Sequence, residues 1–303
     1  MNAATRSATT SGIVAIVLWS SLALLTSATQ GLPPFQVLAT GFGVAAIAAV
    51  LLASLRGRAG WHEWRVPPSA LALTVAGLFG YHALYFFSLK HAPEVEANLL
   101  NYLWPLLIVL FSALLPGIRL RAANIAGALL GFAAAALLIA GGGAGGGAGD
   151  RGDGSSIGYA AAVVAAGVWA GYSVLNRRFA GTPGSAVLPA SVAVALLGAL
   201  AHLWFEETVA PTPGQWLALL PLGLGPVGIA FRLWDRGTRH GDLALLGSLS
   251  YLAPLLSTLL LVAAGRAEPR WQQAVAIVLL LAGAWLSVRG GGRGTPRPED
   301  APA

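Results

Sequence analysis

The stretch Asn98-Leu-Leu-Asn-Tyr-Leu-Trp-Pro-Leu-Leu107 is an apolar run interrupted by two asparagines and a proline. A later stretch, Ser248-Leu-Ser-Tyr-Leu-Ala-Pro-Leu-Leu256, repeats its Tyr-Leu-x-Pro-Leu-Leu core. Tyr102 corresponds to Tyr251 at a spacing of 149 residues (251 − 102), and the two prolines follow at the same spacing. Because this spacing is about half of the 303-residue chain, the repeat indicates two related halves.

The composition around these stretches is that of a membrane protein. Hydrophobic residues make up 56% of the chain, charged residues only 10%, and the mean hydropathy is +0.71. Apolar runs of roughly 18 to 22 residues recur, and each is long enough to cross a bilayer core of ~30 Å as a helix. Too little polar sequence remains to cover a large soluble domain. We therefore predict an all-α integral membrane protein.

Ten transmembrane helices are predicted, in two repeats of five. The spans of the first repeat, residues 12–140, are expected at 12–29, 34–55, 68–89, 94–115 and 120–140. Those of the second, residues 156–288, are expected at 156–176, 184–205, 214–234, 241–264 and 270–288. The glycine-rich stretch 141–155 reads as a periplasmic linker, and residues 1–11 and 289–303 as disordered tails. A signal peptide at residues 12–29 is disfavoured because this run has a partner in the second half.

The two halves are predicted to have opposite orientations. Trp19 and Trp169 are 150 residues apart (169 − 19), and the motifs Gly31-Leu-Pro33 and Gly181-Thr-Pro183 share that spacing. Five spans are an odd number, so the second half must enter the membrane from the opposite side. This arrangement is an inverted repeat.

Loop charges predict that both termini are cytoplasmic. With that orientation, thirteen arginines fall in inner loops and tails: Arg6, Arg56, Arg58, Arg65, Arg119, Arg121, Arg177, Arg178, Arg236, Arg239, Arg289, Arg293 and Arg297. Four basic residues fall outside: Lys90, Arg151, Arg266 and Arg270. This follows the positive-inside rule, and it explains the net charge of +6 better than binding to nucleic acid does.

The repeated prolines place polar groups deep in the membrane. At 1.5 Å per residue, Pro105 lies about 16 Å from the outer end of its helix, and Pro254 lies about 18 Å from the inner end of its own. A proline within a helix frees the carbonyl four residues earlier, here those of Asn101 and Ser250. Asn98 shares a helix face with Asn101. We expect these groups to line a midplane cavity, although they could instead join neighbouring helices through hydrogen bonds.

Aromatic residues are expected around the same cavity. The candidate substrate-binding residues are Trp19, Tyr81, His82, Tyr85, Asn98, Asn101, Tyr102, Trp169, Tyr172, Ser173, Ser250 and Tyr251. His82 is a packing residue in the favoured interpretation, and filling of the core is an equal alternative for the tryptophans. Near the inner end of the eighth span, Arg232 and Asp235 are one helical turn apart and are expected to form a local ion pair.

Motifs for catalysis are missing from the sequence. It has no Gly-x-Ser-x-Gly, no His-Glu-x-x-His and no phosphate-binding glycine loop, since the glycine run at 141–149 lacks the Lys and Ser/Thr that such a loop needs. It also has no cysteine, which excludes disulfides and thiolate metal sites. We expect neither an enzyme nor a cofactor or metal, and a gradient as the energy source.

These features resemble those of a known family. Ten spans in an inverted repeat, basic inner loops and the segment from Asn98 to Pro105 are similar to the drug/metabolite transporter superfamily, in its EamA-type branch. The Trp-Ser-Ser segment at 19–21 and the run Tyr-His-Ala-Leu-Tyr-Phe-Phe at 81–87 are most similar to the members of that branch that export aromatic amino acids. The resemblance covers about residues 12 to 288.

The resemblance implies export across the bacterial inner membrane through a cavity enclosed by spans 1, 3, 4, 6, 8 and 9. The expected partners are an aromatic amino acid and the lipid bilayer, with a monomer as a plausible oligomeric state. In this hypothesis the two halves alternate in access to a midplane site, where amides hold the zwitterion. The runner-up is a permease for other amino acids, drugs or metabolites. A channel is disfavoured because the polar groups cluster at mid-depth.

Overall fold

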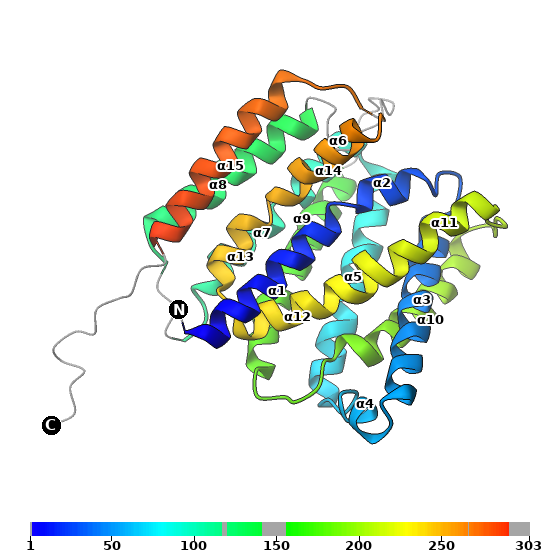
Figure 1. The fold of residues 1–303 in the computed structure, drawn as a ribbon. Helices are drawn as coiled ribbons and strands as arrows, with labels where there is room; N and C mark the ends of the chain where they lie inside the picture. The colour runs from blue at the N-terminus through cyan, green and yellow to red at the C-terminus, as the bar shows by residue number, and fades with distance from the viewer. Residues whose placement is uncertain (1, 117–119, 141–155, 266, 291–303) are drawn as a thin grey trace, which may run out of the picture.

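A computed structural model describes residues 2–116, 120–140, 156–265 and 267–290, and every regular element within these residues is helical (Figure 1). Seven of the described helical segments are long and apolar enough to span a membrane: Ala3–Ser27, Pro34–Leu55, Pro68–His91, Ser156–Phe179, Val187–Phe205, Pro213–His240 and Leu243–Ala263. Three shorter apolar segments accompany them: Glu96–Ser112, Ala122–Leu138 and Trp271–Leu286. The expected all-helical, multi-pass architecture is confirmed.

The described residues of the first half form eight helices. They are α1 (Ala3–Trp19), α2 (Leu22–Ser27), α3 (Pro34–Leu55), α4 (Arg58–His62), α5 (Pro68–His91), α6 (Glu94–Asn101), α7 (Trp104–Ser112) and α8 (Ala122–Ala140). The second half contains α9 (Ser156–Leu175), the 3₁₀ turn η1 (Asn176–Phe179), α10 (Val187–Phe205), α11 (Pro213–Leu222), the π-helix η2 (Gly223–Ile229), α12 (Ala230–His240), α13 (Leu243–Leu249), α14 (Leu252–Ala263) and α15 (Trp271–Gly290). The expected linker at 141–155 lies outside the described residues, and so does the expected tail at 289–303 except for Arg289 and Gly290, which belong to α15.

The expectation of a disordered tail at residues 1–11 is wrong. Helix α1 begins at Ala3, and the side chain of Asn2 caps it by accepting a hydrogen bond from the Thr5 backbone at 2.8 Å. The Ser/Thr-rich turns are helical because they pack against the second half. The hydroxyl of Thr9 accepts a hydrogen bond from the Asp242 backbone at 3.0 Å, and Thr9 is buried.

Both repeated prolines follow an interruption of the helix. One interruption separates α6 from α7, with Pro105 in the first turn of α7, and the other separates α13 from α14, with Pro254 in the first turn of α14. A first helical turn tolerates proline because its N–H groups have no partner within the helix. The carbonyl of Ser250 is not left free as expected, because it accepts a hydrogen bond from the Ala253 backbone at 3.1 Å.

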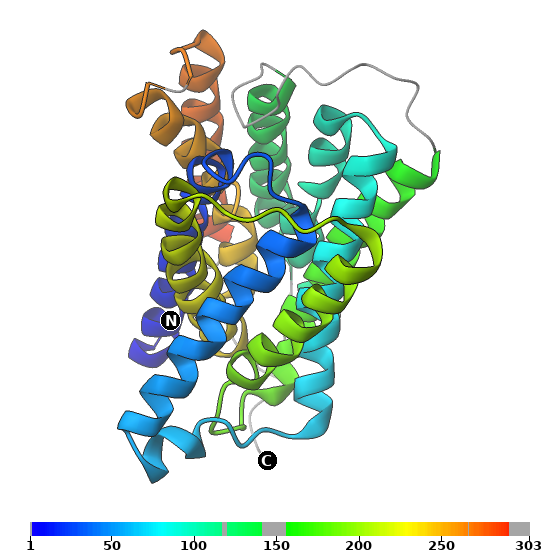
Figure 2. The same ribbon diagram turned by 90° about the vertical axis from the view of Figure 1, so that its right-hand side faces the viewer.

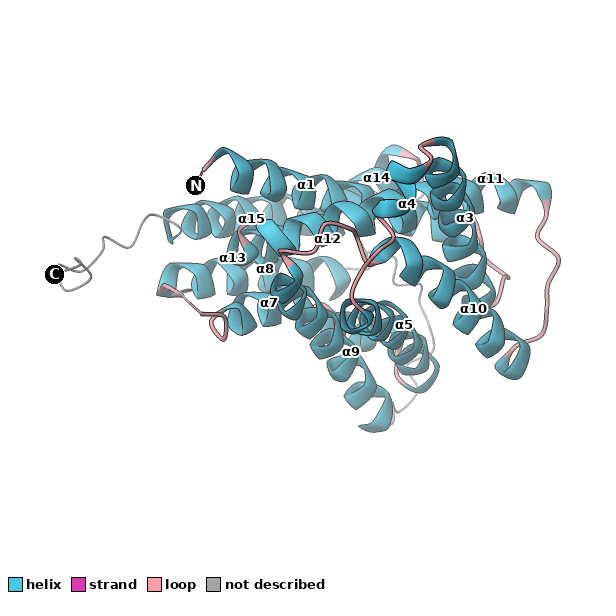
Figure 3. Ribbon diagram, turned by 90° about the horizontal axis from the view of Figure 1, so that it is seen from below, coloured by secondary structure: helices cyan, strands magenta, loops and turns pink. Residues whose placement is uncertain are grey.

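The helices of the two halves pack in equivalent pairs. Helix α1 packs on α12 as its counterpart α9 packs on α5, while α3 packs on α10 and α8 on α15. Figure 3 shows α8 with α15 at one end of the molecule and α3 with α10 at the other. The helices run between two ends of the molecule, with the connecting loops gathered at those ends (Figure 2).

Contacts between helix ends relate the two halves to each other. The N-terminal part of α1 lies beside the start of α13, where Thr9 binds the Asp242 backbone. The start of α9 lies beside the start of α6, where Gly158 leaves no room for a side chain against the His91 carbonyl. Helices α7 and α13 cross where Gly247 approaches the carbonyl of Pro105. Helix α9 is the counterpart of α1, and α6 is the counterpart of α13. The contact of α1 with α13 is therefore repeated by that of α9 with α6, as a two-fold relation between the halves requires.

The crossing of α7 and α13 generates a stability prediction. A Cβ atom at Gly247 would lie 2.9 Å from the Pro105 carbonyl oxygen and 2.8 Å from the side chain of Val109. Because a backbone carbonyl cannot move aside cheaply, we expect Gly247→Ala to destabilise the protein by about 1–3 kcal/mol and to lower Tm in detergent.

Gly43→Ala is the matched control, because a Cβ at Gly43 in α3 meets nothing within 4 Å. Equal Tm values for the two variants would contradict the close crossing of α7 and α13.

Candidate substrate site

Four tryptophans meet at the centre of the molecule, and we call them the tryptophan cluster: Trp19 of α1, Trp104 of α7, Trp169 of α9 and Trp234 of α12. The ring centroid of Trp19 lies 5.7 Å from that of Trp169 and 5.1 Å from that of Trp234. Phe231 packs against both Trp19 and Trp169. Trp19 and Trp169 occupy equivalent positions in the two halves, so the cluster lies where the halves meet.

Hydrogen bonds fix the orientation of two of these indoles. The ring N–H of Trp19 donates to the carbonyl of Pro226 at 3.0 Å, and that of Trp234 donates to the hydroxyl of Ser173 at 3.1 Å. Buried indoles need such a partner. Pro226 lies in the π-helix η2, whose irregular backbone leaves this carbonyl available. Ser173 therefore positions a tryptophan in this conformation.

A polar group lies beside the tryptophans, and we call it the tyrosine–asparagine cluster: Tyr81, Tyr85, Asn98 and Asn101. The Asn101 amide donates to the Tyr81 hydroxyl at 3.0 Å, and the Tyr85 hydroxyl donates to the Asn98 side-chain carbonyl. The two tyrosine rings stack with centroids 6.0 Å apart. Tyr81 also lies 5.4 Å from Trp169, so the two clusters are continuous.

The side-chain oxygen of Asn101 is an unsatisfied acceptor. Asn101 is 4% exposed, and its Oδ1 has no hydrogen-bond partner. Buried polar atoms are nearly always paired, so such an atom calls for an explanation. It can accept a hydrogen bond from an ammonium group, while the nearby hydroxyls and rings supply donors and apolar surface.

The other candidate residues near the clusters have packing contacts. His82 is bonded through Nδ1 to the Leu78 carbonyl at 2.6 Å, and its ring contacts Phe42 and Phe231, in agreement with the packing interpretation. Tyr172 is 2% exposed and its ring lies 5.3 Å from Trp169. Tyr102 is half-buried in the interruption between α6 and α7.

Ser250 and Tyr251 lie apart from this group. The hydroxyl of Ser250 donates to the Leu246 carbonyl at 2.7 Å within its own helix region. The hydroxyl of Tyr251 accepts a hydrogen bond from the backbone of Leu106 at 3.2 Å, and its ring packs with Leu138 and the residues around it. Tyr251 therefore satisfies a backbone N–H in the first turn of α7, in a separate apolar core.

The expected ion pair between Arg232 and Asp235 is wrong. Arg232 instead binds Glu63, the residue that follows α4, and Asp235 binds Arg239 at 3.3 Å. The helix continues to His240, and the Asp235 carboxylate also binds partners on neighbouring segments, which are described next. Both residues of this pair are buried: Asp235 is 2% exposed and Arg239 is 6% exposed.

Asp235 is held by a network that we call the Asp235 network. Its carboxylate accepts hydrogen bonds from Asn176 at 2.9 Å and from Ser185 at 3.0 Å. Arg239 donates to the carbonyls of Gly184 at 2.7 Å and Phe179 at 2.6 Å. A buried charge pair with these additional hydrogen bonds ties α12 to the segment between α9 and α10.

Comparisons with known proteins agree with this arrangement. The profile of the EamA-like transporter family matches residues 7–140 and again residues 156–289. The chain belongs to the EamA-like transporter family. The two matches coincide with the two halves, so each half is one copy of the family's repeat.

Similar proteins include named exporters. The chain is 49% identical to the aromatic amino acid exporter YddG of Ancylobacter novellus over 92% of this chain and 96% of that one. It is 29% identical to the YddG of Escherichia coli, over 94% of this chain and 98% of the other. A solved crystal structure is 46% identical, with a TM-score of 0.87, and covers 95% of this chain and 100% of that one.

Three residues of this transporter's centre were not predicted from the sequence: Trp104, Phe231 and Trp234. The eighth span was expected to end at Trp234, whereas α12 runs to His240. The internal repeat could have identified Phe231 and Trp234. At the spacing of 149, Phe231 corresponds to His82 (231 − 82) and Trp234 to Tyr85 (234 − 85), and both of those were candidates.

Titratable groups outside the spans include one carboxyl near the site. Glu94 begins α6, one helical turn before Asn98, and burial raises the pKa of its carboxyl above the ordinary value. Among the described residues, no group of three His, Asp or Glu side chains is placed to hold a metal ion.

The Asp235 network generates a second stability prediction. Asp235→Asn removes the charge that compensates buried Arg239, so we expect a loss of about 3–5 kcal/mol and a lower Tm of the purified protein. Arg178→Gln, which alters an exposed arginine of η1, is the control and should leave Tm unchanged. A Tm for Asp235→Asn equal to that of the wild type would show that this ion pair is not buried.

Proposed function

We propose that this EamA-family transporter exports aromatic amino acids across the bacterial inner membrane as a secondary transporter. The observation that carries the proposal is the unpaired, buried side-chain oxygen of Asn101 beside a continuous group of aromatic rings. The name of the 49%-identical relative, aromatic amino acid exporter, supports the same substrate class.

Each part of an aromatic amino acid has a matching group in the proposed site. The oxygen of Asn101 accepts from the substrate ammonium, and the Tyr81 hydroxyl, which accepts from the Asn101 amide and keeps its own hydrogen, donates to the substrate carboxylate. Trp19 and Trp169 contact its ring, because aromatic pairs prefer the edge-to-face and offset arrangements that this cluster already contains. A neutral site of this kind binds a zwitterion without burying a net charge.

The proposed orientation has ten spans and both termini in the cytoplasm. The seven long helical segments and three shorter ones supply ten candidates among the described residues. Thirteen basic residues in inner loops against four in outer loops, as counted above, support this orientation. The inverted relation of the halves then follows from five spans in each.

Alternating access is the proposed mechanism, with the inner end closed in this conformation. The pair of Arg232 with Glu63 joins the inner ends of the two halves, and the Asp235 network fixes the inner end of the second half. Toward the outer end, α2 contains no buried residue, whereas α1 contains seven. Rocking of the halves about the tryptophan cluster would open the inner contacts and expose the site to the cytoplasm.

Asn101→Ala should abolish most of the export. Loss of a hydrogen bond to a charged group is worth about 1.5–3 kcal/mol, which corresponds to roughly a 10- to 150-fold weaker interaction with substrate. The measurement is export of labelled tryptophan from cells with matched amounts of protein in the membrane.

Ser250→Ala is the matched control, because the hydroxyl of Ser250 is bonded within its own helix region. Normal export by Asn101→Ala at normal membrane levels would overturn the proposed site.

The substrate class is tested in liposomes. Tryptophan, threonine and a quaternary amine are each supplied to purified protein with and without a pH gradient. Transport of tryptophan over threonine supports the proposal, whereas preference for threonine or the amine favours a permease for other metabolites. Dependence on the gradient would identify proton coupling.

Glu94 generates a pH prediction for binding from the outer face. The ionised carboxylate attracts the substrate ammonium one turn from Asn98, and its raised pKa means that it protonates at a less acidic pH than an ordinary glutamate. Affinity should therefore fall as the pH drops through this raised pKa. Glu94→Gln should bind labelled phenylalanine with a flat profile, while the exposed Glu96→Gln control keeps the wild-type profile. A wild-type profile for Glu94→Gln would exclude this role.

A further inference from the structure

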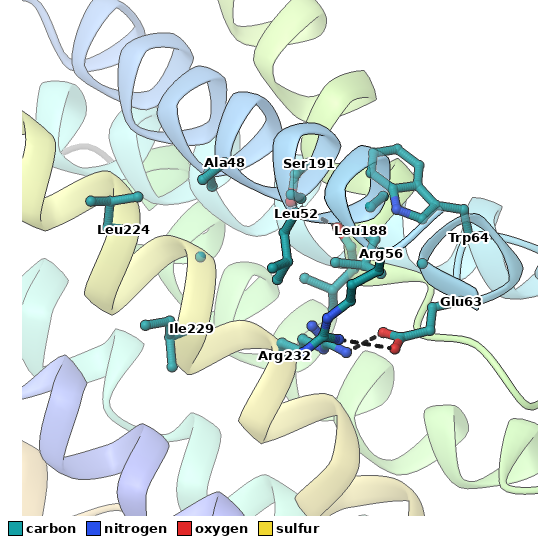
Figure 4. Close-up of a pocket in the computed structure, with 16 residues that line it drawn as sticks. Ala48, Leu52, Arg56, Glu63, Trp64, Leu188, Ser191, Leu224, Ile229 and Arg232 are labelled. Carbon is teal, nitrogen blue, oxygen red and sulfur yellow. Dashed lines mark hydrogen bonds and ion pairs between the residues drawn. The ribbon is translucent and has the colours of Figure 1, made fainter. Parts of the chain in front are cut away.

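A cavity lies apart from the candidate substrate site, between the two halves near their inner ends. It has a volume of about 330 Å³ and is enclosed by α3, α4, α10, η2 and α12. Most of its lining is apolar, and its polar end carries Arg56, Glu63 and Arg232 (Figure 4). We call it the α3–α12 groove. Its volume is at the lower end of the range for small-molecule pockets.

Small residues create the groove. Ala48 and Ala49 of α3 and Gly228 of η2 all line the groove, where larger side chains would fill the space. Gly57 adopts a φ of +58°, which only glycine takes readily, and so turns the chain back at the end of α3. Gly60 then packs directly against the backbone of Ala53, which brings Glu63 and Trp64 beneath the groove.

The apolar part of the groove opens toward lipid. Leu52 is 42% exposed, Leu224 45% and Ile229 55%, and all three line the groove. In a membrane such exposed apolar side chains on spanning helices contact hydrocarbon tails. The groove is therefore continuous with the surface that acyl chains cover, and an acyl chain can enter it from the side.

The polar end has an excess of positive charge. Glu63 binds Arg56 at 3.4 Å and also binds Arg232, so two guanidinium groups share one carboxylate. Figure 4 shows both arginine side chains directed toward Glu63. In the described part of the chain, Glu63 is the one acidic residue of the lining and the one side-chain acceptor of either arginine. Each guanidinium has five N–H donors, so most of them remain available to an anion.

We propose that the α3–α12 groove binds an anionic phospholipid of the cytoplasmic leaflet. One acyl chain lies along the apolar wall, and the lipid phosphate contacts Arg56 and Arg232 beside Glu63. Trp64 lies at the same level, where indoles favour the boundary between headgroups and hydrocarbon. The assignment to the cytoplasmic leaflet rests on the orientation proposed above, and basic pockets between helices on that side are where anionic headgroups bind.

Such a lipid would join the two halves of the transporter. Arg56 follows α3 in the first half, and Arg232 belongs to α12 in the second. Glu63 already connects them, and its backbone carbonyl accepts a hydrogen bond from Ser185 at 3.1 Å. A phosphate bound to both arginines adds a second bridge at the inner end, so the lipid should favour the conformation in which this end is closed.

The test measures binding of phosphatidylglycerol to the full-length protein in detergent, by thermal shift and by the amount of lipid retained in native mass spectrometry. Phosphatidylcholine with the same acyl chains and inorganic phosphate are the comparison ligands. We expect phosphatidylglycerol to raise Tm in a saturable manner at least several-fold more effectively than either. Binding is measured without transport, so it succeeds or fails independently of the proposed substrate.

Four variants separate the contacts. Arg56→Gln and Ala48→Phe should each weaken phosphatidylglycerol binding by roughly 10-fold, one by removing a phosphate contact and the other by filling the groove. Glu63→Gln should strengthen it, because the carboxylate no longer competes for the two arginines. Arg58→Gln, an exposed arginine of α4 outside the lining, should bind as the wild type does.

Results with the wild type and with the variants can each overturn the proposed lipid site. Equal effects of phosphatidylglycerol and phosphatidylcholine, or of phosphatidylglycerol and inorganic phosphate, would overturn the proposal of an anionic lipid. So would equal weakening by Arg58→Gln and Arg56→Gln, since that result indicates general surface charge. Weaker binding by a folded Glu63→Gln variant would show that the carboxylate organises the arginines for structure alone.

Discussion

Hydrocarbon offers no partner for a hydrogen bond, and this constraint explains how two irregular points of the fold are satisfied. The π-helix presents a backbone carbonyl at Pro226, which the indole of Trp19 binds. The interruption before α7 exposes the N–H of Leu106, which the hydroxyl of Tyr251 binds. In both cases the partner comes from the other half of the chain. These two hydrogen bonds therefore satisfy the irregular backbone and at the same time connect the two halves.

The sequence alone predicts much of this fold because its signals are periodic. Apolar runs locate the helices, and the repeated Tyr-Leu-x-Pro-Leu-Leu core locates the interruptions before Pro105 and Pro254. The spacing between Trp19 and Trp169 identifies two members of the tryptophan cluster. Trp234 was not predicted because the expected span ended there, whereas the helical segment Pro213–His240 continues for six more residues (240 − 234) and keeps Trp234 within the core.

Contacts between distant residues were beyond the sequence analysis. Asp235 was paired with its neighbour on the same helix, but its partners Asn176 and Ser185 come from segments that only folding brings near. Tyr102 and Tyr251 occupy equivalent positions in the repeat, but their side chains have different surroundings. A repeat preserves the backbone path, whereas each side chain meets the particular neighbours of its own half, and Tyr251 meets a backbone N–H in an apolar core.

The π-helix at Gly223–Ile229 has a further consequence for how length can vary in this chain. A π turn holds one residue more than an α turn, so removing a residue there would restore a continuous α-helix. A turn of either kind completes one revolution, so Phe231 and Trp234 would keep their facing toward Trp19. The carbonyl of Pro226 would instead return to the hydrogen-bond pattern of a regular α-helix, and the indole of Trp19 would compete with that pattern for its acceptor. A single deletion here would therefore preserve the facing of the aromatic centre and weaken one of its polar anchors.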